Sequence, residues 1–193
     1  MEIVSRSLMK VKNCNEKHLH YRKESDIRNV IAFIMVSSMP FQTGGSGIIS
    51  NLTVEKVTNE FIGIQEFYRK TEGLRIRHEY INISKAELSA EIGLQQVLFL
   101  ANMMSKYYFY KGFQNIWGIV DKGDEYSISY AINTVSPFDG SKYHYNKTDV
   151  LADEYAYLNA VWQIIVSKNE NNVYDMRALE FYPYSFNLLE IMP

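Results

Sequence analysis

The chain has 193 residues, of which 47% are hydrophobic and 14% aromatic, so a single domain can bury a large core without a disulfide or a structural metal. Its one cysteine, Cys14, excludes an internal disulfide, and neither a membrane-length apolar run nor a signal-peptide profile is present, which predicts a soluble cytoplasmic protein. The net charge of −2 does not favour a protein that binds nucleic acid without specificity.

Residues 1–24 are expected to form a basic N-terminal arm or a first strand. Between Ser5 and Lys23 six basic side chains stand against a single acid, Glu16. Such an arm suits a polyanion, and an ordinary solvated surface is the alternative interpretation.

The spacing of apolar residues predicts helices over 26–36, 53–70 and about 149–166, with Ser25 as the N-cap of the first. The glycine-rich stretch 41–51 lacks the ending of a phosphate loop and is interpreted as a flexible connection. The alternating run 74–83 predicts a strand. The sequence "SKAE" after it resembles a capping box and predicts a helix that continues to about Tyr108.

Residues 113–120 and the stretch after Gly123 predict a hairpin of two strands, followed by a turn at Asp139-Gly140. In the second strand, bulky residues alternate with small ones, and the small face carries Ser127, Ser129, Ala131 and Asn133. Residues 166–193 are expected to hold a closing strand and a tail. Together these elements predict an α+β fold, with a central, mainly antiparallel sheet and helices packed on one face.

Three segments, in this order, carry a resemblance to a known family: "IRNVIAFIM", "RHEYINISKAELSAEIG" and "YKGFQNIWGIVDKGDEYSISYAINTVSPFDGSKYHYNKTDV". They resemble the N-terminal helix, the strand with its following helix, and the central hairpin of the relaxase (mobilisation nuclease) family of plasmids and integrative elements. The resemblance spans residues 26–165. It implies one relaxase-like (HUH-endonuclease-like) domain over residues 1–193.

In that family a tyrosine of the N-terminal helix attacks a phosphodiester of single-stranded DNA, and three histidines hold a divalent metal that polarises the phosphate. The matching positions here are Phe33 for the tyrosine, Val120 or Asp121 for the first histidine, and Ser127 and Ser129 for the other two. Phenylalanine has no nucleophilic oxygen, and serine hydroxyls are poor ligands for transition metals. The resemblance therefore implies a relaxase fold without its chemistry and without a cofactor.

The expected function is that of a catalytically degenerate relaxase-like protein of a bacterial mobile element. It would bind single-stranded or hairpin DNA, or assist an active relaxase in mobilisation as part of a relaxosome. The residues expected to contact DNA are Arg75, Arg77, Asn133, Lys142, Tyr143, His144 and Lys147.

Two other functions stay open. In the first, the protein is an active DNA-nicking enzyme in which Tyr21 replaces the nucleophile, or in which Asp121, Asp124 and Glu125 bind Mg²⁺ or Mn²⁺ together with Asn133. A charged hairpin turn is the competing interpretation of those acids. In the second, the protein is an interaction module that binds no DNA.

Overall fold

The computed structural model describes residues 11–13, 21–39, 42–143 and 148–166. The chain divides into two compact units, residues 1–143 and 144–193. The second unit contributes one described helix, α4 (Thr148–Val166), which agrees with the helix predicted over 149–166. His144, Lys147 and the predicted closing strand lie outside the described residues, and the expectation of a single domain stays a prediction. No helix in the described ranges is both long enough and apolar enough to cross a membrane.

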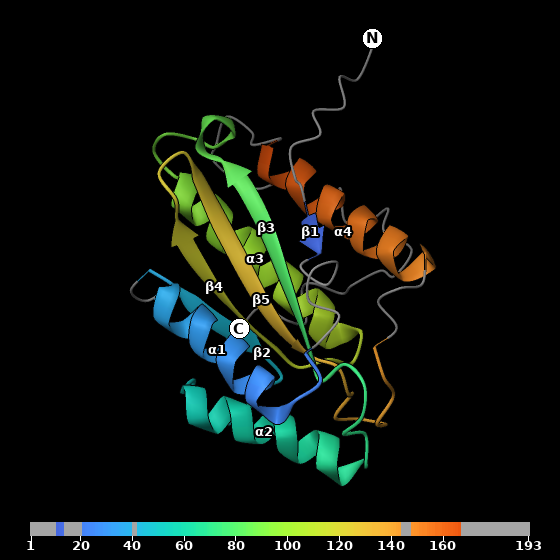
Figure 1. Ribbon diagram of the computed structural model, residues 1–193. Coiled ribbons are helices and arrows are strands. Elements are labelled where there is room, and N and C mark those ends of the chain that lie inside the picture. Colours follow the sequence, from blue (N-terminus) through green and yellow to red (C-terminus); the bar gives the residue numbers. More distant parts are fainter. Residues whose placement is uncertain (1–10, 14–20, 40–41, 144–147, 167–193) are drawn as a thin grey trace. The chain divides into compact units, whose positions relative to one another are not determined.

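A five-stranded antiparallel sheet forms the centre of the first unit (Figure 1). Its strand order is β1-β3-β5-β4-β2, and each strand runs antiparallel to its neighbours. The strands are β1 (Val11–Asn13), β2 (Thr43–Ser46), β3 (Ile76–Ser84), β4 (Asn115–Asp121) and β5 (Glu125–Asn133). The predicted α+β class and the antiparallel hairpin β4–β5 are confirmed.

Helices cover both faces of this sheet, so the expectation of helices on one face is wrong (Figure 1). On one face, α1 (Glu24–Ser37) and α2 (Val54–Phe67) share a core with the sheet. On the other face, α3 (Gly93–Tyr110) lies against Tyr130, whose hydroxyl donates a hydrogen bond of 3.2 Å to the Ala101 carbonyl. The last seven residues of β5 are buried on both faces, which is why a second helical layer is required.

The core between α1, α2 and the sheet follows the predicted helical spacing. Four apolar residues of the first helix, at the spacing of one helical stripe, are buried, and they pack with residues of α2, β3, β4 and β5. The members of this cluster are Ile27, Val30, Ile31, Ile34, Val57, Phe61, Ile76, Ile116 and Ala131. The aromatic side chain of Phe33 lies outside this stripe and is half exposed.

Two helix starts differ from the prediction. Helix α1 begins one residue before Ser25, and its N-cap is Lys23, whose amide donates to the Asp26 carboxylate at 2.8 Å. The "SKAE" segment forms only a 3-10 turn, η2 (Lys85–Glu87), and the Ser84 side chain caps no amide. The amide of Lys85 donates instead to the Asp124 carbonyl at 2.9 Å, which ties this turn to the β4–β5 hairpin. Helix α3 therefore starts later, at Gly93.

The glycine-rich stretch also differs from the prediction. Its residues 43–46 form the strand β2, which pairs with β4, instead of a flexible connection. A Cβ atom at Gly44 would lie 2.5 Å from the Trp117 ring, and one at Gly45 would lie 2.7 Å from the Asn115 carbonyl oxygen. Glycine is needed here because the strand approaches its neighbour and a large aromatic ring too closely for any side chain.

Candidate functional site

Two of the positions that the resemblance assigns to catalysis, Phe33 and Ser129, contact His78, a buried residue of β3. Its Nε2 lies 2.8 Å from the Ser129 hydroxyl of β5. The Phe33 ring of α1 stands edge-on to the imidazole, with 5.8 Å between ring centroids. The Tyr21 ring, just before α1, lies 6.4 Å from the imidazole. The fold thus brings together residues that are far apart in the sequence.

Neighbouring residues of β3 complete this group. The Tyr80 ring lies 4.4 Å from the imidazole, and its hydroxyl is 3.5 Å from Nδ1 of His78. Two residues further along, the Asn82 side-chain carbonyl accepts a hydrogen bond of 2.7 Å from the Ser127 hydroxyl. Val120 pairs with Ser127 in the sheet register and so lies on the same face. Both serine hydroxyls are thus hydrogen-bonded to side chains of β3.

The small face of β5 also allows α1 to pack closely on the sheet. Gly118 of β4 pairs with Ser129, and a Cβ atom there would lie 1.8 Å from the Ser38 hydroxyl and 3.0 Å from a methyl carbon of Ile34. The Ser38 hydroxyl is itself held by the Ile34 carbonyl. Small residues at these positions are therefore required for packing, whether or not the face ever held a metal.

The acidic hairpin turn does not join Asn133. Asp121 accepts hydrogen bonds from the Lys85 ammonium at 2.7 and 2.8 Å and from the Gly123 amide at 2.9 Å, and these hold the pKa of its carboxyl below the usual range. Glu125 pairs with Lys122 at 3.3 Å, while Asp124 lies in the turn between these acids. Asn133 ends β5 eight residues after Glu125, roughly 26 Å away at ~3.3 Å per residue. The described residues contain no group of three or more histidine, cysteine, aspartate or glutamate side chains that could hold a metal ion.

Asn133 belongs instead to a buried amide network between α2 and the sheet. Its side-chain oxygen accepts a hydrogen bond of 2.9 Å from the Gln65 side-chain amide. Its side-chain nitrogen donates one of 3.1 Å to the side-chain oxygen of Gln114. The side-chain amide of Gln114 in turn donates a hydrogen bond of 2.7 Å to the Glu60 carboxylate. A completely buried amide with these partners stabilises the fold and is not open to DNA.

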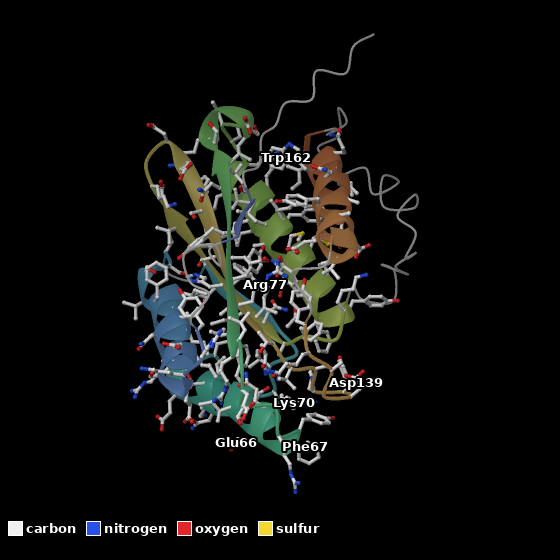
Figure 2. The ribbon with its side chains drawn as sticks, turned by 45° about the vertical axis from the view of Figure 1, so that its right-hand side comes forward. Glu66, Phe67, Lys70, Arg77, Asp139 and Trp162 are labelled. Atoms are coloured by element: carbon white, nitrogen blue, oxygen red, sulfur yellow. The ribbon has the colours of Figure 1, made fainter. Side chains whose placement is uncertain are left out.

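Arg77, which was expected to contact phosphate, lies in the interior beneath α3 (Figure 2). It is 1% exposed and forms an ion pair with Glu79, which also accepts a 2.6 Å hydrogen bond from the Tyr108 hydroxyl. The guanidinium lies 4.7 Å from the centroid of the buried Tyr143 ring. A side chain so enclosed cannot reach a nucleic-acid backbone without rearrangement of the core.

Arg75 and Lys142 lie close together near the start of β3. Arg75 is also buried, and its guanidinium donates to the Gln65 side-chain carbonyl at 2.5 Å. Lys142 is half-buried, and its ammonium donates to the Glu72 carbonyl. Of the predicted DNA contacts within the described residues, Lys142 is thus the one that solvent reaches.

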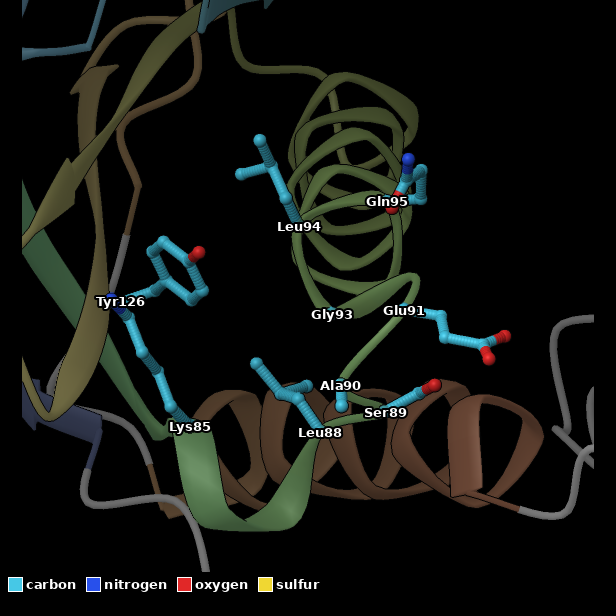
Figure 3. A pocket seen from close by; sticks show the side chains of 9 residues that line it. All are labelled: Lys85, Leu88, Ser89, Ala90, Glu91, Gly93, Leu94, Gln95 and Tyr126. Carbon is cyan, nitrogen blue, oxygen red and sulfur yellow. The ribbon is translucent and has the colours of Figure 1, made fainter.

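A cleft of about 320 Å³ opens elsewhere, beside the N-terminus of α3 (Figure 3). Lys85, Ser89, Glu91, Gln95 and Tyr126 supply its polar lining, and none of the residues around His78 contributes to it. Lys85 is already paired with Asp121 and lies 4.6 Å over the Tyr126 ring. Because its two charged side chains have opposite signs, the cleft favours neither anions nor cations.

Sequence reasoning missed the roles of Tyr80 and Asn82. Both lie on the His78 face of β3, which the alternation of that strand indicates. What the sequence could not indicate is that β3 pairs with β5, since the two strands are separated by η2, α3 and β4.

Comparison of the chain with protein-family models, curated proteins and solved structures finds no match. The class of protein that can be stated is therefore an α+β fold with an antiparallel sheet between helices. Its distinguishing site is the histidine-centred group of Tyr21, Phe33, His78, Tyr80 and Ser129.

Proposed function

We propose that this protein is a relaxase-like DNA-binding protein that has lost strand-transfer chemistry. It binds single-stranded or hairpin DNA, or assists an active relaxase, in a bacterial mobile element. The proposal rests on the sequence resemblance. One observation on the fold supports it: the nucleophile position Phe33 and the metal-ligand position Ser129 both contact His78.

This convergence supports the proposal because Phe33 and Ser129 are on different elements and ninety-six positions apart in the sequence. An enzyme that transfers DNA strands needs its nucleophile beside its metal, so the two positions must meet in any fold that performs the reaction. If the match of these two positions to the family were accidental, there would be no reason for both of them to contact the same side chain.

The residues present account for the loss of chemistry. The Phe33 ring carries no oxygen that could attack phosphorus. The Ser129 and Ser127 hydroxyls are bonded to His78 and Asn82, and they are neutral donors without the softness that a transition metal prefers. The one imidazole at this site, that of His78, stands at none of the three histidine positions of the family and lies within reach of two hydroxyl groups.

Incubation of the protein with supercoiled plasmid and with labelled single-stranded oligonucleotides, in Mg²⁺ or Mn²⁺, tests the proposal. We expect unchanged plasmid topology, no covalent protein–DNA adduct, and oligonucleotide binding that weakens as salt rises. A covalent adduct, or the absence of any DNA binding at low salt, would overturn it. An authentic relaxase with its own origin plasmid serves as the positive control for nicking.

A second candidate function is retained nicking with Tyr21 as the nucleophile. The observation in its favour is the Tyr21 ring, 6.4 Å from the His78 imidazole, a residue able to accept a proton from a phenol. The attacking phenolic oxygen would form a phosphotyrosine bond as the bond from phosphorus to the 3′ oxygen breaks. The phenol proton would pass to His78 and from there to the leaving 3′ oxygen, which becomes a hydroxyl. Tyr21→Phe would abolish such an adduct and Tyr80→Phe would leave it in place, which distinguishes this enzyme from the inert protein.

A further inference from the structure

Two exposed aromatic rings stand at one end of the first unit. Phe67, the last residue of α2, is 79% exposed, and Phe138, in the turn after β5, is 65% exposed. Tyr68 connects them: its ring lies 4.9 Å from the Phe67 ring, and its hydroxyl donates a 3.1 Å hydrogen bond to the carbonyl of Pro137, which precedes Phe138. At about 200 Å² for a fully exposed ring, the two side chains leave about 300 Å² of largely apolar surface open to water, as much as the largest apolar patch on many soluble proteins.

The positions of these rings are fixed by packing. The Tyr68 ring lies directly on Gly140, where an added Cβ would be 2.3 Å from a ring carbon. Phe138 packs on Phe109 of α3, with 5.6 Å between ring centroids. The surface is therefore preorganised, and binding to it would order few additional groups.

Lys142 lies at the base of the turn that carries Phe138, where it pairs with Val135 across the turn. Its ammonium donates to the Glu72 carbonyl. The pKa of this ammonium is lowered first by burial and then by the positive charge of Lys70, so the two ammonium groups lie near one another. The segment that follows α2 and the turn that follows β5 thus bring their charged residues to one surface.

Six charged side chains that solvent reaches surround the two rings, three of each sign. The cations are Arg69, Lys70 and Lys142, and the acids are Glu66, Glu72 and Asp139. Arg75 is buried and is not among them. Glu66 and Asp139 are the chain neighbours of the two rings, and Figure 2 shows both acids at the end of the unit where Phe67 lies. None of the six forms an ion pair within the part of the chain that the structure describes, so their charges are available to a partner.

This balance of charge decides which partner the surface fits. A polyanion would meet as many carboxylates as cations here, and so would a strongly acidic protein. A symmetric pair of identical chains has a different requirement, because the same surface faces itself and each residue meets the counterpart of its own partner. A surface of one sign would repel its own copy, whereas a neutral surface with both signs can place every cation opposite a carboxylate.

We propose that this surface, which consists of Phe67, Phe138 and the six charged side chains around them, joins two copies of the chain in a symmetric homodimer. The rings form the apolar centre of the contact, and the charged side chains form its rim. The inference does not depend on the proposed DNA-binding function. Because the rings supply about 300 Å² of the roughly 800 Å² that each partner of a stable complex buries, the dimer should be weak and should depend on concentration.

Sedimentation velocity of the full chain, at concentrations from about 1 µM to about 200 µM, tests the proposal. We expect the mass to rise with concentration and to level off at two copies. Phe67→Ala and Phe138→Ala should each raise the dissociation constant at least about 30-fold, the effect of one hot-spot residue. Val36→Ala is the matched control, because Val36 is an 80% exposed apolar side chain of α1 that lies outside this surface, and it should change nothing.

The charge balance is tested by a pair of reversals. Lys70→Glu changes three cations and three acids to two and four, and Glu66→Lys changes them to four and two. Each variant alone should therefore repel its own copy and dimerise less than the wild type, with part of the loss recovered at high salt. An equimolar mixture of the two variants should form a heterodimer, because one surface is now positive and the other negative.

A chain that stays monomeric over the whole concentration range would overturn the inference, and so would association that continues beyond two copies. Dimers that survive in both alanine variants would place the contact elsewhere on the molecule. Reversal variants that weaken the dimer but do not pair with each other would refute the complementary rim. Thermal unfolding of every variant should match the wild type, because all the substituted side chains are exposed.

Discussion

The imidazole of His78 and the hydroxyl of Ser129 form a buried hydrogen bond of 2.8 Å between two central strands of the sheet. Ser129→Ala would leave a ring nitrogen of His78 without this partner in the interior, so we expect a loss of about 1–3 kcal/mol in the free energy of unfolding. Urea denaturation measures it. Ser25→Ala is the control: Ser25 is an exposed residue inside α1, and its replacement should leave stability unchanged or slightly raised. An equal loss in both variants would contradict the buried bond.

A pair of glycine substitutions tests how closely α1 packs on the sheet. Gly118→Ala would place a Cβ 1.8 Å from the Ser38 hydroxyl, so we expect a loss of about 1–3 kcal/mol. Gly63→Ala, on the open side of α2 with nothing within 4 Å, should gain about 0.5–1 kcal/mol by removing a flexible residue from a helix. Thermal unfolding of the two variants should shift in opposite directions, and a shift in the same direction would refute the packing.

The buried ion pair of Arg77 and Glu79 should be intolerant of losing one partner. Arg77→Met leaves the Glu79 carboxylate enclosed without its cation, although the Tyr108 hydroxyl still donates a 2.6 Å hydrogen bond to it, so we expect about 3–5 kcal/mol of destabilisation. The double variant Arg77→Met, Glu79→Leu should recover much of that loss because no charge remains buried. Chemical denaturation that finds the double variant worse than the single one would argue against the pairing.

The pH dependence of stability should report on Asp121. Its folded-state pKa lies below the ordinary value of 3.8 because the Lys85 ammonium and then the Gly123 amide bind the carboxylate. A lowered pKa adds stability that is fully present above 3.8 and is lost as the pH falls through the folded-state value. Lys85→Met should therefore be less stable than the wild type at neutral pH, with the gap closing below pH 3.8. Both groups are exposed, so the gap should be small and salt-sensitive, and Lys56→Met should show none.

Arg69 follows the C-cap of α2 with a positive φ of 54°. Arg69→Gly removes the penalty of a side chain at φ 54°, so we expect a gain of about 1 kcal/mol in stability. Calorimetry measures the effect. A variant that loses stability would show that the arginine side chain makes contacts that support the fold.

Much of the fold could be predicted from periodicity. The apolar stripe of α1 and the alternation of β5 are local patterns, and the structure confirms both the helix and the hairpin. The start of α3 could not be predicted, because η2 is held by the amide of Lys85 on the Asp124 carbonyl, a contact between segments far apart in the chain. The strand β2 was missed for a similar reason, since Gly44 and Gly45 favour a strand only beside Trp117 and Asn115.

The candidate site could be predicted only in part. The sequence indicated that Phe33 and Ser129 occupy special positions, but not that His78 would lie between them. The sequence also suggested Arg77 as an exposed contact to DNA. Sequence alone cannot distinguish an exposed arginine from one that is paired with Glu79 in the interior. The exposed rings of Phe67 and Phe138 became apparent only from burial in the folded chain.

The outer strand β2 at one edge of the sheet is short, with four residues, of which two are glycine. A long, regular sheet edge acts as a template on which strands of other molecules add, and this is a common route to aggregation. Edges of this length offer too few backbone groups to hold a foreign strand. At the β2 edge, a chain this rich in tyrosine and phenylalanine is thereby protected from joining its neighbours.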